Sequence, residues 1–202
     1  MKIAYFGYDL FYLCLKKLLL SDDIEVLKVF SFPPNEDDKN DKVKSLADEY
    51  GIEFTEKKAT KQDILKLKND GLDLIVCAGY AYKIPVDKEI KGINMHPALL
   101  PEGRGAWPMP VTILKGLSKT GLTVHEIEES FDTGKILKQI EYTLKKDETL
   151  ESLCEWLLKT SAELMYDCVI NYDEYIKTAK EQLGGEYWKL PTKEDMTFDD
   201  NT

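Results

Sequence analysis

The alternation of apolar and polar residues divides the first half of the chain into strands and helices. Short apolar runs, each ending close to a glycine or a proline, predict buried strands at residues 2–7, 24–32 and 72–78. Apolar side chains at helical spacing predict helices between them, at residues 9–20, 42–50 and 61–69. Alternation of this kind is typical of an open, mostly parallel sheet flanked by helices, so we expect an α/β, Rossmann-like fold.

The second half changes character after a further short strand at residues 91–96. Four prolines and two glycines make residues 97–110 a long ordered loop, a kind of segment that is often functional. Two more strands are predicted, and Asp147 is the expected N-cap of one long amphipathic helix that reaches residue 177. The strands lie at residues 121–127 and 136–144. A polar, irregular tail follows, so we divide the chain into a main domain (1–183) and a C-terminal extension (184–202).

The composition is that of an ordinary globular protein, with 43% hydrophobic residues among 202, enough for one compact domain with a real core. No apolar run approaches the roughly 18 residues that span a bilayer, and the N-terminus has no signal-peptide cleavage site. The four cysteines are widely spaced without a CxxC pair, which favours buried thiols over a disulfide or metal set. We therefore expect a cytoplasmic protein without a membrane partner.

The formal net charge of −10 limits the partners of the chain. Nucleic-acid binding draws much of its affinity from Lys and Arg on phosphates, and the sequence has no cluster of basic residues. A nucleic-acid partner is therefore disfavoured. The oligomeric state stays open, a homodimer included.

Asn94 and His96 stand two residues apart at the end of a predicted strand. Side chains at that spacing point to the same face of a sheet, and ligands of open α/β sheets bind beyond the carboxyl ends of the strands. An amide and an imidazole side by side indicate a site, although a pair satisfied by loop backbone gives the same pattern. Asp132, which precedes Thr133 and Gly134, has by itself only the features of a turn.

Other catalytic patterns are missing from the sequence. His96 and His125 are its two histidines and no Cys-His pattern accompanies them, so a metal site is not expected. No GxSxG elbow supports a nucleophilic serine. Gly7, after the first strand, opens neither a GxGxxG motif nor a P-loop.

Four segments, taken together, resemble the folate-dependent formyltransferases, the family of the methionyl-tRNA, glycinamide ribonucleotide and sugar N-formyltransferases. The segments are Gly92-Ile93-Asn94-Met95-His96-Pro97-Ala98-Leu99-Leu100-Pro101, Arg104-Gly105-Ala106, Gly121-Leu122-Thr123-Val124-His125 and Phe131-Asp132-Thr133-Gly134. The family pattern is roughly N-x-H, then L-L-P and R-G, and later D-T-G. The resemblance implies the formyltransferase fold for the main domain.

The resemblance implies that the chain moves a formyl group from 10-formyltetrahydrofolate to an amine, with Asn94, His96 and Asp132 as catalytic residues and without a metal. The chemistry asks for the same groups. Formyl transfer develops an oxyanion, which Asn94 and His96 would stabilise as hydrogen-bond donors. The attacking amine must lose a proton, and Asp132 suits a proton shuttle, directly or through water.

In the family, the folate donor is bound largely by the loop after the fourth strand and the loop before the catalytic aspartate. The residues at these places, together with two at the entrance, are Tyr80, Ala81, Tyr82, Lys83, Ile84, Leu99, Leu100, Glu128, Ser130 and Phe131. The first loop departs from the small apolar sequence usual in the family, because it carries two tyrosines and a lysine. Tyr80 and Tyr82 therefore suit packing as well as folate contact.

The acceptor is expected to be the primary amine of a small molecule, and an amino sugar nucleotide is the class that the sequence contradicts least. Methionyl-tRNA is disfavoured by the acidic charge, and because the chain ends at Thr202 without the further domain of that enzyme. Glycinamide ribonucleotide is disfavoured because Asp9 stands where that enzyme has a phosphate-binding loop. A hydrolase that releases formate would use the same three residues, and a non-catalytic folate-binding protein would carry the same motifs, so both interpretations stay open.

Arg104 and His125 are the candidate contacts to the acceptor. Arg104 suits an acidic part of the acceptor, and it suits equally well a role in ordering its own loop. Replacement of His125 is expected to affect acceptor affinity more than chemistry.

Overall fold

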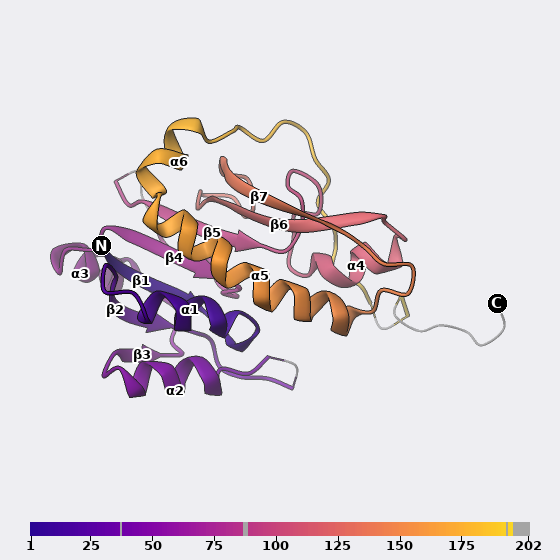
Figure 1. Ribbon diagram of the computed structural model, residues 1–202. Coiled ribbons are helices and arrows are strands. Elements are labelled where there is room, and N and C mark those ends of the chain that lie inside the picture. Colours follow the sequence, from indigo (N-terminus) through magenta and orange to yellow (C-terminus); the bar gives the residue numbers. More distant parts are fainter. Residues whose placement is uncertain (37, 87–88, 193, 196–202) are drawn as a thin grey trace.

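The computed structural model describes residues 1–36, 38–86, 89–192 and 194–195. In this part of the chain seven strands form one sheet in the order β3-β2-β1-β4-β5-β6-β7 (Figure 1). The strands are β1 (Lys2–Gly7), β2 (Glu25–Phe30), β3 (Glu53–Thr55), β4 (Leu74–Ala78), β5 (Gly92–His96), β6 (Lys119–Glu126) and β7 (Ile136–Thr143). The five strands β1 to β5 pair in parallel, and β6 and β7 are antiparallel. The predicted open, mostly parallel α/β sheet is confirmed.

Helices cover both faces of this sheet. They are α1 (Tyr12–Leu19), which follows a 3-10 turn η1 (Asp9–Phe11), α2 (Asp41–Glu49), α3 (Lys61–Asn69), α4 (Pro108–Leu114), α5 (Leu150–Ile170) and α6 (Tyr172–Thr178). One apolar cluster packs α1 and α5 against the sheet, for example through Leu15 and Met165. A second cluster lies on the other face, where Ile64 and Leu67 of α3 meet Phe6 of β1. Burial of these side chains on both faces holds the carboxyl ends of the strands in fixed places.

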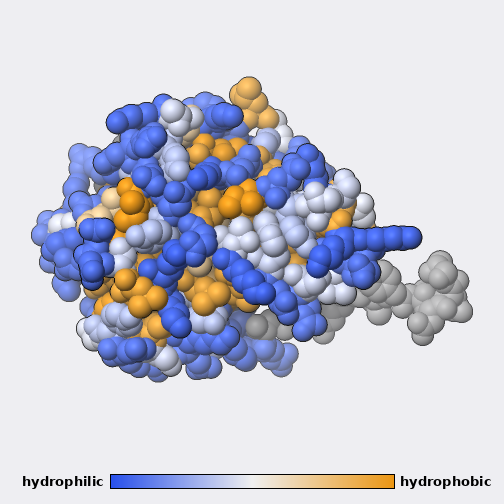
Figure 2. All heavy atoms as spheres, in the orientation of Figure 1, coloured by the Kyte–Doolittle hydropathy of each residue, from blue (hydrophilic) through white to orange (hydrophobic). Residues whose placement is uncertain are grey.

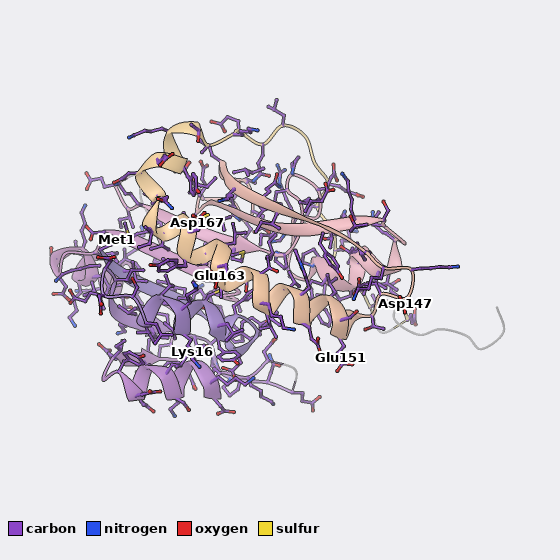
Figure 3. All side chains as sticks on the ribbon, in the orientation of Figure 1. Met1, Lys16, Asp147, Glu151, Glu163 and Asp167 are labelled. Carbon is purple, nitrogen blue, oxygen red and sulfur yellow. The ribbon has the colours of Figure 1, made fainter. Side chains whose placement is uncertain are left out.

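The long helix α5 lies across the front of the sheet beside α1 (Figure 1). Glu151, Glu163 and Asp167 lie along it (Figure 3). Glu163 pairs with Lys17 of α1, and Asp167 pairs with Lys138 of β7, so α5 is tied both to the neighbouring helix and to an edge strand of the sheet. The surface that this view presents is mostly hydrophilic with scattered apolar groups (Figure 2). No helix among the described residues has the length and apolar character to cross a membrane.

Three details of the second half differ from the prediction. The helix α4 begins at Pro108, within the stretch expected to be a loop, because a proline in the first turn removes an amide that would have no helical partner. The expected helix at 147–177 is broken at Asn171, whose side-chain amide bonds to Asp167. Its N-cap is Thr149 and not Asp147, because Thr149 and Ser152 form a reciprocal capping box.

We expect Thr149→Ala to lower the free energy of unfolding by about 1 kcal/mol, because the Ser152 amide then loses its capping acceptor. Urea unfolding followed by circular dichroism measures this. Thr160→Ala, the same change in the interior of α5, is the matched control and should cost nothing, because alanine favours a helix interior. Equal costs for the two variants would contradict the capping account.

The segment after α6 returns along the edge strand and then crosses the loops that follow β5 and β6. Lys180 and Ile136 exchange two backbone hydrogen bonds of 2.9 and 2.8 Å. Further on, the amide of Trp188 donates to the carbonyl of Arg104 at 2.7 Å. The division between a main domain (1–183) and an extension (184–202) stays a prediction, and residues 193 and 196–202 of that extension lie outside the described part.

Candidate active site

Strand β5 delivers Asn94 and His96 to one cleft at the carboxyl end of the parallel strands. Both side chains line this cleft, which has a volume of about 540 Å³. Their spacing of two residues along a strand places them on the same face, as the sequence predicts. Strand β6 pairs antiparallel with β5, and the register of this pairing sets His125 directly opposite Asn94.

Asp132 reaches the same place from the connection between β6 and β7. Its Oδ1 lies 3.4 Å from His96 Nδ1, and its Oδ2 accepts a hydrogen bond of 3.0 Å from the amide of Gly105. The side chain is 10% exposed. The backbone at Asp132 has φ of 57°, in the left-handed region where an aspartate is tolerated and most residues are strained. The unusual backbone aims the carboxylate at His96.

One hydrogen bond settles which nitrogen of His96 exchanges a proton. The Nε2 atom lies 2.7 Å from the carbonyl oxygen of Gly103, and a carbonyl only accepts. Nε2 therefore keeps its hydrogen in both charge states. The proton that titrates sits on Nδ1, which faces Asp132.

The environment sets the resting charges of this pair. Burial lowers the pKa of His96 below its ordinary value of 6.5, although Asp132 and the Gly103 carbonyl act in the opposite direction. Burial alone would raise the pKa of Asp132, but His125, His96 and the Gly105 amide outweigh it and bring this pKa down to about 2. At neutral pH Asp132 is therefore ionised and His96 is neutral. The space between Nδ1 and Oδ1 is a place where one proton can be taken up.

His125 orients Asn94. Its Nδ1 lies 2.7 Å from the carbonyl of Glu126, so Nδ1 carries the hydrogen, and in the neutral ring Nε2 then accepts from Asn94 Nδ2 at 3.1 Å. This contact occupies one N–H of the amide and leaves the second for a ligand. His125 Nε2 is also 3.6 Å from Asp132 Oδ1. Within the described residues, no group of three or more His, Cys, Asp or Glu side chains is placed to hold a metal ion.

Most of the residues expected to bind the donor line the same cleft. Those that do so are Tyr80, Ala81, Lys83, Ile84, Glu128, Ser130 and Phe131. Three others lie away from its lining. Tyr82 packs edge-on against Tyr80, Leu99 packs over Gly121, and Leu100 is buried and bonds through its carbonyl to Gln139. Folate contact by any of these ten residues stays a prediction.

The guanidinium of Arg104 is engaged within the protein. Its Nε and Nη2 donate to the side-chain oxygen of Gln182 at 3.1 and 2.9 Å. These contacts fit a role in ordering its own loop, and acceptor contacts by Arg104 and by the buried His125 stay predictions. Sequence reasoning missed the carbonyl of Gly103 and the amide of Gly105, because backbone groups leave no signature in a side-chain pattern.

Sequence comparison gives a family match over most of the chain. The family model described as formyl transferase matches residues 21–169. The chain belongs to the formyl transferase family. The membership expected from the motifs is thereby confirmed.

Among its relatives in this family, a methionyl-tRNA formyltransferase of Sulfurimonas denitrificans is 31% identical over 214 residues, covering 100% of this chain and 71% of the relative. A methionyl-tRNA formyltransferase of Sulfurovum sp. is 30% identical and covers 85% of this chain. The match spans 55% of the Sulfurovum protein, so the chain corresponds to only part of that relative's length.

Solved structures of formyltransferases share the fold of this chain. Glycinamide ribonucleotide transformylase 1 from Symbiobacterium toebii superposes with a TM-score of 0.71 at 19% identity, covering 86% of this chain and 88% of that one. WlaRD, a sugar 3N-formyl transferase solved with dTDP and 5-N-formyl-THF, superposes with a TM-score of 0.68 at 19% identity. This superposition covers 93% of this chain and 69% of WlaRD. At these identities the likeness shows the fold alone.

The charge state of the pair gives a direct prediction. We expect the NMR titration midpoint of His96 to lie below pH 6.5 and to fall further in Asp132→Asn, because the anion that favours the imidazolium is removed. The chain has two histidines, so a His125→Gln variant assigns the signals. A midpoint that stays constant or rises in Asp132→Asn would show that the two side chains do not interact.

Proposed function

We propose that this chain transfers the formyl group of 10-formyltetrahydrofolate to the primary amine of a small-molecule acceptor. The observation that carries the proposal is the contact of His96 with Asp132, beside Asn94, at the floor of one cleft. Membership of the formyl transferase family supports the reaction class. Asn94, His96 and Asp132 are the residues to which we assign the chemistry.

Asn94 supplies the first part of the mechanism. When an amine attacks the formyl carbon, a C–N bond forms and the formyl oxygen gains negative charge. The N–H of Asn94 that His125 leaves free donates to this oxygen, and it is already oriented before the reaction begins.

His96 and Asp132 move the proton. The amine nitrogen becomes positively charged as its bond forms, and His96 Nδ1 takes up its proton while the carboxylate of Asp132 stabilises the imidazolium. The same proton then passes to the folate nitrogen as the second C–N bond breaks. The pair ends in its starting charge state, and neither a metal nor a covalent enzyme intermediate takes part in this scheme.

The walls of the cleft fit a folate donor. The ring of Tyr80 is held by its hydroxyl, which accepts from the amide of Ala59, and Ile84 and Phe131 add apolar surface nearby. Backbone of the loop that begins at Gly79 forms part of the same wall. A flat, partly apolar ring with polar edges is the kind of ligand that such a wall suits. We assign donor binding to the seven predicted residues that line it.

We propose an amino sugar, free or linked to a nucleotide, as the acceptor class. The cleft lining includes Asp38, Glu128 and Glu129, with Lys83 as the one Lys or Arg in its described lining, so it attracts the amino group of an acceptor, which arrives as an ammonium group. An anionic acceptor at the loop after β1 is disfavoured, because Asp9 already occupies the amides of Lys42 and Val43 at the start of α2. The WlaRD structure, a sugar 3N-formyl transferase, shares the fold over 93% of this chain.

Methionyl-tRNA is the second candidate. Two relatives, 31 and 30% identical to this chain, are named methionyl-tRNA formyltransferases, which favours this acceptor. The net charge of −10 opposes a polyanionic partner, since tRNA binding needs Lys and Arg on phosphates.

The test is a panel assay with purified protein and 10-formyltetrahydrofolate, in which release of tetrahydrofolate is followed and products are weighed by mass spectrometry. Free amino sugars, their nucleotide-linked forms, glycinamide ribonucleotide and methionyl-tRNA are added one at a time. We expect release that depends on an amino sugar and yields its formylated product. Release of formate without any amine would identify a hydrolase, and folate binding without turnover on the whole panel would identify a binding protein. Either outcome would overturn the proposal.

A further inference from the structure

The side-chain amide of Gln182 joins the two loops that carry the catalytic contacts. Its Nε2 donates to the carbonyls of Asp132 and Gly134 at 3.0 and 2.7 Å. Its Oε1 accepts both Nε and Nη2 of Arg104. An amide has two hydrogens and two lone pairs, so all four hydrogen-bonding positions of this side chain are used.

The first of these contacts acts on the backbone of Asp132, the residue that carries the catalytic carboxylate. Asp132 has φ of 57°, and a residue held in that region costs of order 1–3 kcal/mol unless its surroundings compensate. The two hydrogen bonds from Gln182 hold the backbone on both sides of Thr133 in this conformation. The side chain of Asp132 bonds to Gly105 on the far side, which fixes its direction.

The second contact acts on the loop that orients His96. Arg104 lies between Gly103, whose carbonyl bonds to His96, and Gly105, whose amide bonds to Asp132. The segment around Gln182 holds Arg104 twice more, because the Arg104 amide donates to Glu186 and its carbonyl accepts from Trp188. The same C-terminal segment therefore holds both the Arg104 loop and the backbone of Asp132.

We infer that Gln182 is a positioning residue, which holds Asp132 and the Arg104 loop in the one arrangement that brings the carboxylate to His96 Nδ1. This inference rests on the proposed function for its consequence in catalysis. Displacement of a catalytic group by about 1 Å costs on the order of a hundredfold in rate. Loss of Gln182 should therefore lower kcat with little change in the KM for either substrate, because Gln182 does not line the cleft.

Two variants separate this role from simple support of the Arg104 side chain. Gln182→Ala removes all four hydrogen bonds. Gln182→Glu keeps an acceptor for Arg104 but places carboxylate oxygens against the carbonyls of Asp132 and Gly134. Glu181→Ala is the matched control, since the neighbouring Glu181 makes a surface ion pair with Lys135 at 3.2 Å and is exposed.

The first measurement is the NMR titration of His96, whose other titratable neighbours are Asp132 and His125. It needs neither folate nor acceptor, so it stays decisive even if the proposed function fails. We expect the midpoint to fall by about 0.3 pH units or more in Gln182→Ala and in Gln182→Met, which both leave the charge unchanged, and to stay in place in Glu181→Ala, because a displaced carboxylate stabilises the imidazolium less. An unchanged midpoint in whichever of these two neutral variants folds would overturn the inference.

The second measurement is kinetic. Gln182→Ala and Gln182→Glu should both lose on the order of tenfold to a hundredfold in kcat, with KM values within about threefold of the wild type. Arg104→Ala combined with Gln182→Ala should be no slower than the slower single variant, because the two residues act as one unit. Full activity of Gln182→Glu, or a fall confined to the acceptor KM, would show instead that Gln182 serves only to place Arg104.

Discussion

Asp132→Asn is expected to lower kcat for formyl transfer by about a thousandfold while the protein keeps its fold. The amide cannot hold the negative charge that stabilises a protonated His96, so the proton of the attacking amine has no stable place to go. Asparagine tolerates the left-handed backbone at this position, and its side-chain oxygen still accepts from the amide of Gly105. The loss should therefore come from chemistry and not from unfolding.

Steady-state rates and thermal unfolding of the wild type and Asp132→Asn measure this effect. Asp173→Asn is the control, because Asp173 forms an exposed ion pair with Lys91 at 3.2 Å, outside the cleft lining. If Asp132→Asn kept more than about a tenth of the wild-type kcat, stabilisation of the protonated His96 by this carboxylate would be the wrong mechanism.

His96→Gln should lower kcat by at least about a hundredfold. Glutamine can donate a hydrogen bond toward Gly103, but no atom of its amide takes up a proton at neutral pH. The comparison with His125→Gln is informative, because both histidines are buried and both lie near Asp132. His125 orients Asn94 through a hydrogen bond that a glutamine can partly replace, so we expect a smaller fall in kcat there.

The same kinetic assay, run with saturating donor, compares the two histidine variants. A larger loss in His125→Gln than in His96→Gln would exchange the roles of the two rings. A loss that appears only in the acceptor KM of His125→Gln would support the contact to the acceptor that the sequence suggests for this residue.

Much of the fold is predictable because its central strands, such as β1 and β4, are buried on both faces. Residues 3–6 and 74–78 are apolar throughout and are each followed by a glycine, and this pattern has few other interpretations. The short strand β3 is not predicted from the sequence, because three residues at the edge of the sheet show no alternation of apolar and polar side chains. The helix α4 is also not predicted, because Pro108 and Pro110 are typical of a loop. Both prolines are nevertheless compatible with the first turn of a helix.

The parts of the site that lie close together in the sequence are predictable, and the parts that come from distant loops are not. Asn94 and His96 share one strand, so their common face follows from a spacing of two residues. Asp132 comes from a different loop, and its approach to His96 depends on the antiparallel return of β6, the positive φ at Asp132 and the contacts of Gln182. None of these features appears as a periodic pattern in the sequence. From the sequence, the place of Asp132 in the site is therefore predicted by the family resemblance alone.

The fate of the formyl carbon distinguishes formyl transfer from hydrolysis. The purified wild-type protein is incubated with 10-formyltetrahydrofolate that carries carbon-13 in its formyl group, together with an amino sugar acceptor, and the carbon is followed by NMR. We expect the label to move to the formamide of the acceptor in the wild type and this transfer to slow about a thousandfold in Asp132→Asn. Label that ends as free formate, or transfer that proceeds equally fast in both proteins, would contradict this expectation.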